Sequence, residues 1–356
     1  MPLLQPEKQT DELIPGLPNE IAELCLLHVP YPYQPLARSV SSSWNRAITN
    51  PSFLLSKNTL SHPYLFVFAF HKHTGRLQWQ ALDPSSGRWF VLPPMPLPDA
   101  VCPTGFACAS LQRQGKLYVI GGMGSDDVTS ISTALVYSTA TNRWSQASPI
   151  PGGRAFLAAE GVNGRIVAVG RNETDIYEPE SDTWRKGAGL GRELSRYETT
   201  VVEGKVYVTE GWWWPFMFRP RGWVYDMERD TWREMGLGMR DGWTGVGVAV
   251  AGRVFVITEY GDCPVKVYDE ERDTWRFVEG DRFPREAMQR PFAARGLEDR
   301  MYVVSSGLNV AIGSVVFVDE GEGGKGGVRV KLTWQVLEAP QNLVEFSPCS
   351  CQVVYA

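Results

Sequence analysis

One stretch recurs along the chain and constrains its fold more than any other feature. The copy at 252–275 reads GRVFVITEYGDCPVKVYDEERDTW. It starts with a Gly-Arg turn, continues into a run of β-branched and aromatic residues, crosses a polar loop to a second short apolar run, and ends with an acidic turn and Trp275. A unit this short cannot bury its own apolar face, so it must stack against neighbouring copies in a solenoid or a ring.

Five further copies bring the number of repeats to six. Three of them share the tyrosine of the second apolar run and the closing tryptophan: 115–144, 164–184 and 204–232. Two looser copies, 64–89 and 299–334, flank the series. A tryptophan recurs at one position of the repeat, so we expect these side chains to pack one repeat against the next. They are Trp89, Trp144, Trp184, Trp232, Trp275 and Trp334.

The number of strands predicts a closed ring. One more short apolar strand precedes each repeat except the first, which begins at Tyr64, and a lone strand at 349–355 follows the last repeat. If the last strand pairs with the first repeat, it supplies the strand that this repeat lacks and closes the ring. Closure also covers the strand edges that an open array would expose. We therefore predict a mainly β fold, a six-bladed β-propeller over residues 62–356 closed by strand 349–355. Seven blades or an open solenoid are the alternatives.

Residues 13–57 differ from the rest because their apolar side chains follow helical spacing. Leu17, Ile21 and Cys25 recur every four residues. Pro18 suits the first turn of a helix and Pro30 ends it, and two more helices are expected at 35–42 and 43–48, before a stop at 50–51. The sequence predicts a small three-helix domain that needs a partner to cover its apolar surface. Residues 1–12 are polar and are expected to be a disordered lead-in.

These patterns resemble a known family. Leu17-Pro18-x-Glu20-Ile21, then Val29-Pro30 and Val40-x-x-x-Trp44, match the F-box pattern, and the repeats resemble kelch repeats, with Gly121-Gly122 as the paired glycines. Over nearly its whole length the chain is similar to plant F-box/kelch proteins. The resemblance implies a kelch-type propeller behind an F-box that docks on a Skp-type adaptor and, through it, a cullin complex.

On that resemblance the chain is the substrate-recognition subunit of an SCF-type E3 ubiquitin ligase, with a role in plant regulation that includes light signalling. The F-box residues that the resemblance assigns to the adaptor face, or to its support, are Leu17, Pro18, Ile21, Leu26, Val29 and Pro30. The alternative is that they form the internal core of the helical domain.

One loop has the composition of a binding surface. The segment 210–222, within the fourth repeat, holds three tryptophans, two phenylalanines and two arginines, as interface hot spots do. The resemblance places it on one face with the loops leading into the following blades. The client-binding candidates on that face are Trp212, Trp213, Trp214, Phe216, Phe218, Arg219, Arg221, Arg154, Arg196, Arg240, Trp243 and Arg290.

Converging arginines would suit an acidic or phosphorylated client. Two alternatives stay open: the loop buries its aromatic side chains against a neighbouring loop, or each arginine serves in a structural salt bridge.

Several function classes are disfavoured by what the chain carries. All four histidines precede residue 74, so a Ser-His-Asp, Cys-His or His-rich metal site is hard to assemble in the later repeats. The net charge of −5 is spread without a basic run, which disfavours nucleic acid and anionic membranes. No stretch is long and apolar enough for a membrane span, and no secretory signal stands at the start.

The six cysteines lack paired C-x-x-C spacing, as expected of reduced thiols. We therefore expect an intracellular protein, nuclear or cytoplasmic, without cofactor or metal, that recognises a client without catalysis. The competing predictions are a binding scaffold without degradation and, from another class, a propeller enzyme or small-molecule receptor.

Overall fold

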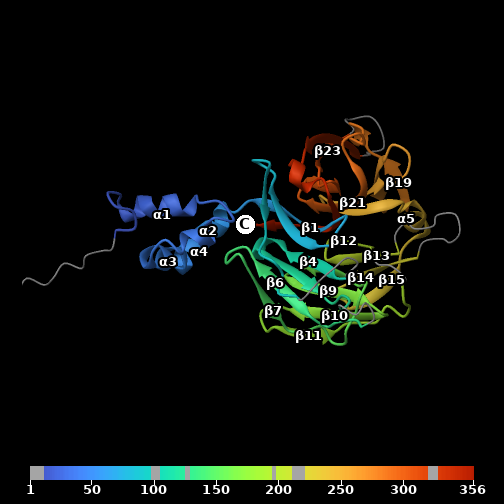
Figure 1. Cartoon of the computed structure of the whole chain (residues 1–356). Helices are drawn as coiled ribbons and strands as arrows, with labels where there is room; N and C mark the ends of the chain where they lie inside the picture. Colours follow the sequence, from blue (N-terminus) through green and yellow to red (C-terminus); the bar gives the residue numbers. More distant parts are fainter. Residues whose placement is uncertain (1–11, 98–104, 125–128, 195–197, 211–220, 320–327) are drawn as a thin grey trace, which may run out of the picture.

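The structure is a computed structural model that describes residues 12–97, 105–124, 129–194, 198–210, 221–319 and 328–356. A small helical domain protrudes from a ring of β-sheets, and the C-terminus lies where the two meet (Figure 1). The helical domain contains α1 (Asn19–Leu27), α2 (Gln34–Ala37), α3 (Ser42–Ile48) and α4 (Pro51–Leu60). Its core is formed by Leu26, Leu27, Ala37, Ile48 and Phe53.

The helical domain has one helix more than the sequence predicted. The pair Asn50-Pro51 ends α3 as expected, but it also starts α4, because the Asn50 side chain accepts a hydrogen bond from the backbone N–H of Ser52 at 3.0 Å. Pro51 then occupies the first turn, where its missing N–H costs nothing. The pair Asn50-Pro51 therefore marks both the end of one helix and the start of the next.

The ring has six blades, each built on four antiparallel strands, as predicted. Blade 1 is β25 (Phe346–Tyr355), β1 (Pro63–His71), β2 (Leu77–Asp83) and β3 (Arg88–Val91). Blade 2 is β4 (Ala107–Leu111), β5 (Lys116–Ile120), β6 (Ala134–Ser138) and β7 (Arg143–Ala147); blade 3 is β8 (Ala158–Val162), β9 (Arg165–Gly170), β10 (Glu173–Glu178) and β11 (Thr183–Lys186).

Blade 4 is β12 (Glu198–Val202), β13 (Lys205–Thr209), β14 (Gly222–Asp226) and β15 (Thr231–Glu234); blade 5 is β16 (Gly245–Val250), β17 (Arg253–Thr258), β18 (Val265–Asp269) and β19 (Thr274–Phe277). Blade 6 is β21 (Gln289–Leu297), β22 (Arg300–Ser306), β23 (Val310–Asp319) and β24 (Val328–Leu337), with β20 (Glu279–Gly280) added in parallel at its outer edge. Short helices α5 (Leu237–Gly242), η1 (Gln112–Gln114) and η2 (Gln341–Leu343) lie in the connections.

The C-terminal strand closes the ring. β25 pairs with β1 from Pro63↔Tyr355 to His71↔Phe346, and its residues Val353 and Val354 are fully buried. The predicted return of the last strand to the first blade is confirmed, and the strand is longer than the predicted 349–355 because pairing resumes beyond a bulge at Phe68/Ala69.

The two faces of the ring differ in their connections. In each blade the turns between the first and second strands, and between the third and fourth, lie on one face, because the strands alternate in direction. We call this the turn face, and the opposite one, with the second-to-third connections and the loops into the next blade, the loop face. β1 begins on the turn face at Pro63, so the helical domain joins the ring there.

A recurrent set of hydrogen bonds, here called a latch, fastens neighbouring blades. The indole N–H of Trp184 in blade 3 donates to the carbonyl of Ser148, just after the outer strand of blade 2, at 2.7 Å. Asp182 accepts hydrogen bonds from the Ser148 N–H at 2.8 Å and from the Tyr177 phenol at 2.6 Å. Blade 3 thus holds blade 2 through both the N–H and the carbonyl of Ser148.

The latch recurs in blades 4 and 5 and, in part, in blade 2, so the predicted packing role of these four tryptophans is confirmed. In blade 4 the latch consists of Trp232, Tyr225 and Asp230 and holds Ala188. In blade 5 it consists of Trp275, Tyr268 and Asp273 and holds Gly238 and Met239. In blade 2 it consists of Trp144, Tyr137 and Asn142 and holds only the carbonyl of Pro93.

Ring closure should be the most sensitive point of the fold. The substitution Val353→Asp places a carboxylate in the fully buried seam and should destabilise the protein by about 3 kcal/mol or more. Cys349→Ala, on an exposed position of the same strand, is the matched control and should change stability little. Urea unfolding measures both, and equal stabilities would contradict the closure role.

The latches should make stability depend on acid. The Tyr225 phenol and the Ala188 N–H hold the pKa of Asp230 below its ordinary value, so its contribution is complete above about pH 4 and is lost as pH falls through the lowered folded pKa. Asp230→Asn should lower the free energy of unfolding at pH 7 by up to about 1 kcal/mol, and the difference from wild type should vanish near pH 2. Urea unfolding across pH tests this; a pH-independent difference contradicts it.

Candidate functional site

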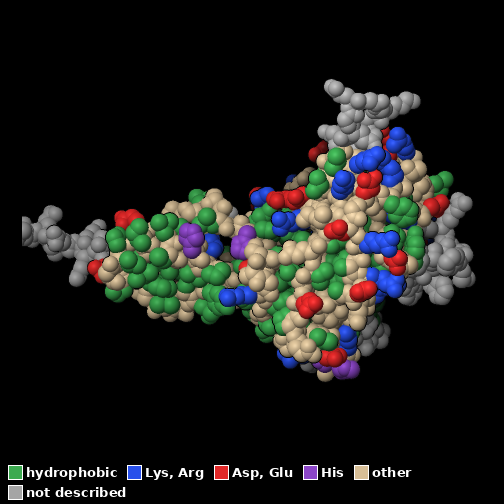
Figure 2. All heavy atoms as spheres, turned by 90° about the horizontal axis from the view of Figure 1, so that it is seen from above, with side chains coloured by type: hydrophobic (Ala, Val, Ile, Leu, Met, Phe, Trp, Pro, Cys, Tyr) green, Lys and Arg blue, Asp and Glu red, His purple; other side chains and the backbone are tan. Residues whose placement is uncertain are grey.

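An apolar surface covers much of the helical domain. Of seventeen exposed large hydrophobic side chains in the described residues, nine lie between residues 17 and 60. Hydrophobic side chains dominate this domain in Figure 2, whereas charges of both signs are interspersed over the ring. We call the following set the apolar patch: Leu17, Ile21, Leu24, Leu36, Val40, Leu54, Leu55 and Leu60. A contiguous apolar surface on a small domain marks a binding site for another protein.

The structure separates the six predicted adaptor residues. Leu17, Pro18, Ile21 and Pro30 are exposed, and Val29 is half-buried. Leu26 is only 1 % exposed and belongs to the internal core, so it supports the patch from beneath and does not contact a partner. Five members of the patch on later helices and turns were not among the residues assigned to the adaptor face, although Val40 stands in the F-box pattern: Leu36, Val40, Leu54, Leu55 and Leu60. Their exposed faces could be assigned only once α2 to α4 had been placed.

Lys57 holds the end of α1 in position beneath the patch. Its Nζ donates to the carbonyls of Leu27 and Val29, both at 3.0 Å, and so satisfies groups that the end of a helix leaves unpaired. Burial lowers the pKa of this amine. The α1–α4 arrangement that displays Ile21 is therefore fixed by a polar contact as well as by the core.

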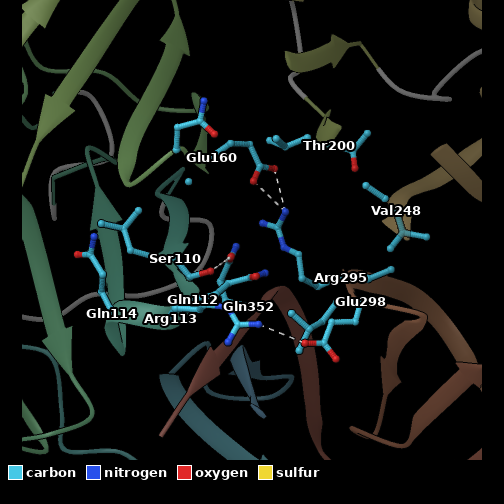
Figure 3. A pocket seen from close by; sticks show the side chains of 18 of the residues that line it. Ser110, Gln112, Arg113, Gln114, Glu160, Thr200, Val248, Arg295, Glu298 and Gln352 are labelled. Atoms are coloured by element: carbon cyan, nitrogen blue, oxygen red, sulfur yellow. Dashed lines mark hydrogen bonds and ion pairs between the residues drawn. The ribbon is translucent and has the colours of Figure 1, made fainter. Parts of the chain in front are cut away.

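An ion pair divides the central channel of the ring into two cavities. Glu160 on β8 and Arg295 on β21 meet across the channel from opposite blades, and Arg295 Nη1 lies 3.0 and 2.9 Å from the two carboxylate oxygens (Figure 3). Thr199 also donates to Glu160, at 2.7 Å. Both residues line a cavity of about 460 Å³ that opens on the turn face and one of about 450 Å³ that opens on the loop face.

The turn-face cavity is lined by polar groups that pair with one another. In Figure 3, Ser110 donates to Gln352 at 2.9 Å and Arg113 lies 3.4 Å from Glu298. The loop-face cavity contains the thiols of Cys108 and Cys351, and burial raises the pKa of each to about 12. A thiol with such a pKa stays protonated at neutral pH and is a poor nucleophile.

Metal chemistry finds no support in the part of the chain that the structure describes, where no three His, Cys, Asp or Glu side chains are grouped as a metal site requires. The cavities have no histidine among their lining residues. None of the described helices is long and apolar enough to cross a bilayer.

The structure corrects part of the predicted client-binding set. Arg154 is 1 % exposed and forms ion pairs with Asp175 and, at 2.7 Å, with Glu173. Trp243 is also 1 % exposed and packs edge-on against Trp275 between blades 4 and 5. Neither can contact a client, because the loops that carry them fold back onto the ring.

The remaining described candidates lie on the loop face with partners of their own. Arg221 pairs with Glu210, Arg240 pairs with Glu234, and the guanidinium of the exposed Arg290 donates to the sulfur of Cys263 at 3.3 Å. The structure therefore does not bring these arginines together as one anion-binding cluster. The other candidates, Trp212, Trp213, Trp214, Phe216, Phe218, Arg219 and Arg196, lie outside the described residues.

Phe156 is a loop-face residue that sequence reasoning missed. Its side chain is 55 % exposed although its backbone has φ = 55°, a region that bulky residues rarely adopt. The Phe156 N–H donates to the Gly105 carbonyl at 2.8 Å, which joins the two segments that lead into β4 and β8 on the loop face. An exposed aromatic side chain kept at a strained position is typical of a binding surface.

The protein thus has two domains, a six-bladed propeller and a helical domain that joins its turn face. The helical domain carries the exposed apolar patch. Two family patterns match the chain, the F-box domain over residues 14–56 and the Kelch motif over residues 105–151. The chain is 51% identical over 360 residues to F-box protein AFR of Arabidopsis thaliana, covering 98% of this chain and 94% of that protein.

An F-box/kelch-repeat protein of the same plant is 36% identical, covering 97% of this chain and 87% of its own. The chain therefore belongs to the F-box/kelch-repeat proteins. Among solved structures, the structure of YjhT matches 68% of this chain and 85% of its own with 15% sequence identity and a TM-score of 0.43.

The strain at Phe156 leads to a stability test. Phe156→Gly removes a side chain from a backbone conformation that suits glycine, so stability should stay unchanged or rise by about 0.5–1 kcal/mol. Phe277→Gly, at a 68 % exposed position within β19, should lower stability instead, because glycine weakens a strand. Urea unfolding of both variants decides; a marked loss for Phe156→Gly would make that ring a structural element.

Proposed function

We propose that this chain is a non-catalytic substrate receptor of an SCF-type ubiquitin ligase. The apolar patch binds a Skp-type adaptor, which connects the chain to a cullin complex, and the loop face of the propeller binds a client protein. The observation that supports this most directly is the patch itself, because a domain with a core of five buried side chains leaves eight large apolar ones in water. Their burial against a partner supplies the driving force for docking.

The mechanism is one of proximity. The helical domain leaves the ring at the turn face, so a client on the loop face and an adaptor on the patch do not compete for space. Holding both partners on one chain raises the concentration of client lysines near the ubiquitin-transfer machinery. An enzymatic function has less support, because burial raises the pKa of the Cys108 and Cys351 thiols and no histidine is among the residues that line either cavity.

The client contact is proposed on the loop face at the exposed Phe156, next to Leu157, which lines the loop-face cavity together with Phe106. Client binding by the aromatic loop 210–222 stays a prediction. A nuclear or cytoplasmic location and a role in light signalling also stay predictions. Recognition of an acidic client is not proposed for Arg154, Arg221 and Arg240, because each already pairs with a carboxylate of the fold.

Adaptor docking is tested by placing a charge in the patch. Leu36→Asp, at a 63 % exposed position, should weaken binding of purified Skp-type adaptor by at least about tenfold, because a carboxylate would be buried without a partner. Phe277→Asp, at a 68 % exposed position on blade 5, is the matched control and should bind normally. Titration calorimetry gives both affinities, and circular dichroism verifies the fold.

Equal affinities for the two variants would remove the patch from the adaptor interface. The client is sought separately with a photocrosslinking amino acid at position 156, using position 277 as the reference. A protein captured only from position 156, and stabilised in cells by proteasome inhibition, would support the receptor role; capture without stabilisation would favour the scaffold.

A further inference from the structure

The helical domain is anchored in the ring by a buried tyrosine as well as by the covalent linker. Tyr31, in the turn after α1, is 4 % exposed and belongs to the same apolar cluster as Tyr64 and Phe66 of blade 1 and Tyr137 of blade 2. Its ring lies 5.1 Å from that of Tyr64, edge to face, and 5.8 Å from that of Phe66. A side chain of the helical domain is therefore part of the propeller core.

The Tyr31 phenol is hydrogen-bonded to a member of the latch between blades 1 and 2. Its oxygen lies 2.5 Å from that of Tyr137, which donates to Asn142 at 2.5 Å. With the Tyr137 proton directed at Asn142, the Tyr31 hydroxyl must donate and the Tyr137 oxygen must accept. The Tyr64 phenol donates in turn to the Tyr31 carbonyl at 3.3 Å.

This latch differs from the other three in the peptide that it holds. In blades 3 to 5 an aspartate accepts a backbone N–H from the preceding blade. The corresponding position before blade 2 is Pro93, which offers only its carbonyl, to Trp144 at 2.9 Å. The aspartate is replaced by the neutral Asn142, so no carboxylate is left without its backbone donor, and Tyr31 supplies the additional contact.

A side chain that only filled space in the apolar core would not need the hydroxyl and its hydrogen bond to Tyr137. Phenylalanine would pack against Tyr64 and Phe66 equally well and would carry no buried hydroxyl. Tyr33, two residues on, provides the contrast: it is 44 % exposed and only its ring touches Phe90, at 5.9 Å between centroids. The hydroxyl of Tyr31 therefore adds direction to the contact.

We propose that Tyr31 is a positioning residue that fixes the direction in which the helical domain leaves the ring. The linker at Ser61 and His62 alone would allow a hinge, which is the usual behaviour of domains joined by a small contact. The phenol–phenol contact adds a second attachment on blade 2. Its consequence for ubiquitin transfer rests on the proposed function: a rigid receptor presents client lysines within a narrow range of distances from the transfer machinery.

The test measures the spread of distances between the two domains. Donor and acceptor dyes are placed by unnatural amino acids at Glu23 in α1 and Glu180 in blade 3, both exposed, and single-molecule energy transfer is recorded on the full chain. Tyr31→Ala should widen the distance distribution by about twofold or more, because the domain is then restrained only by the linker, the exposed Tyr33–Phe90 ring contact and the bond from Tyr64 to the carbonyl of residue 31. Tyr31→Phe removes only the hydroxyl and should widen it by a smaller, measurable amount, while Tyr33→Phe should leave it unchanged.

A second measurement uses the ligase itself. In a complex reconstituted with adaptor, cullin, RING protein and charged E2, the lysines of this chain that receive ubiquitin are mapped by mass spectrometry. Tyr31→Ala should spread modification over more lysines than in wild type, with unchanged affinity for the adaptor.

Each outcome decides one question. An unchanged distance distribution in Tyr31→Ala overturns the positioning role; if that variant does not fold, an unchanged distribution in Tyr31→Phe does so. Wider distances without any adaptor binding, even in wild type, would refute the proposed function and leave the positioning role standing. Wider distances with an unchanged lysine pattern would confine the role of Tyr31 to domain orientation and contradict its part in transfer.

Discussion

The pairing of the last strand with the second strand of blade 1 is the contact on which the rest of the molecule depends. β25 contributes Val353 and Val354 to a seam that is fully buried, and without it blade 1 would lack its innermost strand and the ring would have two open edges. The same seam locates the helical domain, because β1 starts beside Tyr355 on the turn face. The strand pairing that closes the ring therefore also fixes the point at which the helical domain is attached.

Around the ring the blades are joined by unequal means. Four latches connect blades 1 to 5, whereas the indole nitrogens of Trp89 and Trp334 have no hydrogen-bond partner among the described residues. Blade 6 is held instead by the edge-on contact of Phe283 with Trp334, by the added strand β20 and by the shared core with blade 1. The Glu160–Arg295 pair then ties blade 6 to blade 3 across the channel, so the part of the ring without latches is braced from the opposite side.

The architecture could be predicted from the sequence because its signals are local and repeated. Spacing of the glycine turns, tryptophans and short apolar runs gave six blades, and counting strands gave the closure. Exposure of single side chains could not be obtained in this way: Arg154 and Trp243 read as surface residues in loops, yet the loops fold back and bury them. Leu26 lies in an adaptor-binding pattern, but its side of α1 faces Phe53 and Ile48 in the core. The backbone conformation of Phe156 depends on Gly105, and the burial of Tyr31 depends on Tyr64 and Tyr137. These neighbours are distant in the sequence, so the chain carries no local signal for either feature.

The separation of the two faces limits how a client can be recognised. On the loop face, Arg154, Arg221 and Arg240 are used within the fold. Drawing Arg154 away from Asp175 would leave that buried carboxylate with only Lys186, at 3.5 Å, as counter-charge. A client that bound through those arginines would thus weaken the ring that presents it. Contacts through exposed side chains that the fold does not need, such as Phe156, carry no such cost. Such side chains can change while the latches and the seam keep the geometry between the loop face and the helical domain constant.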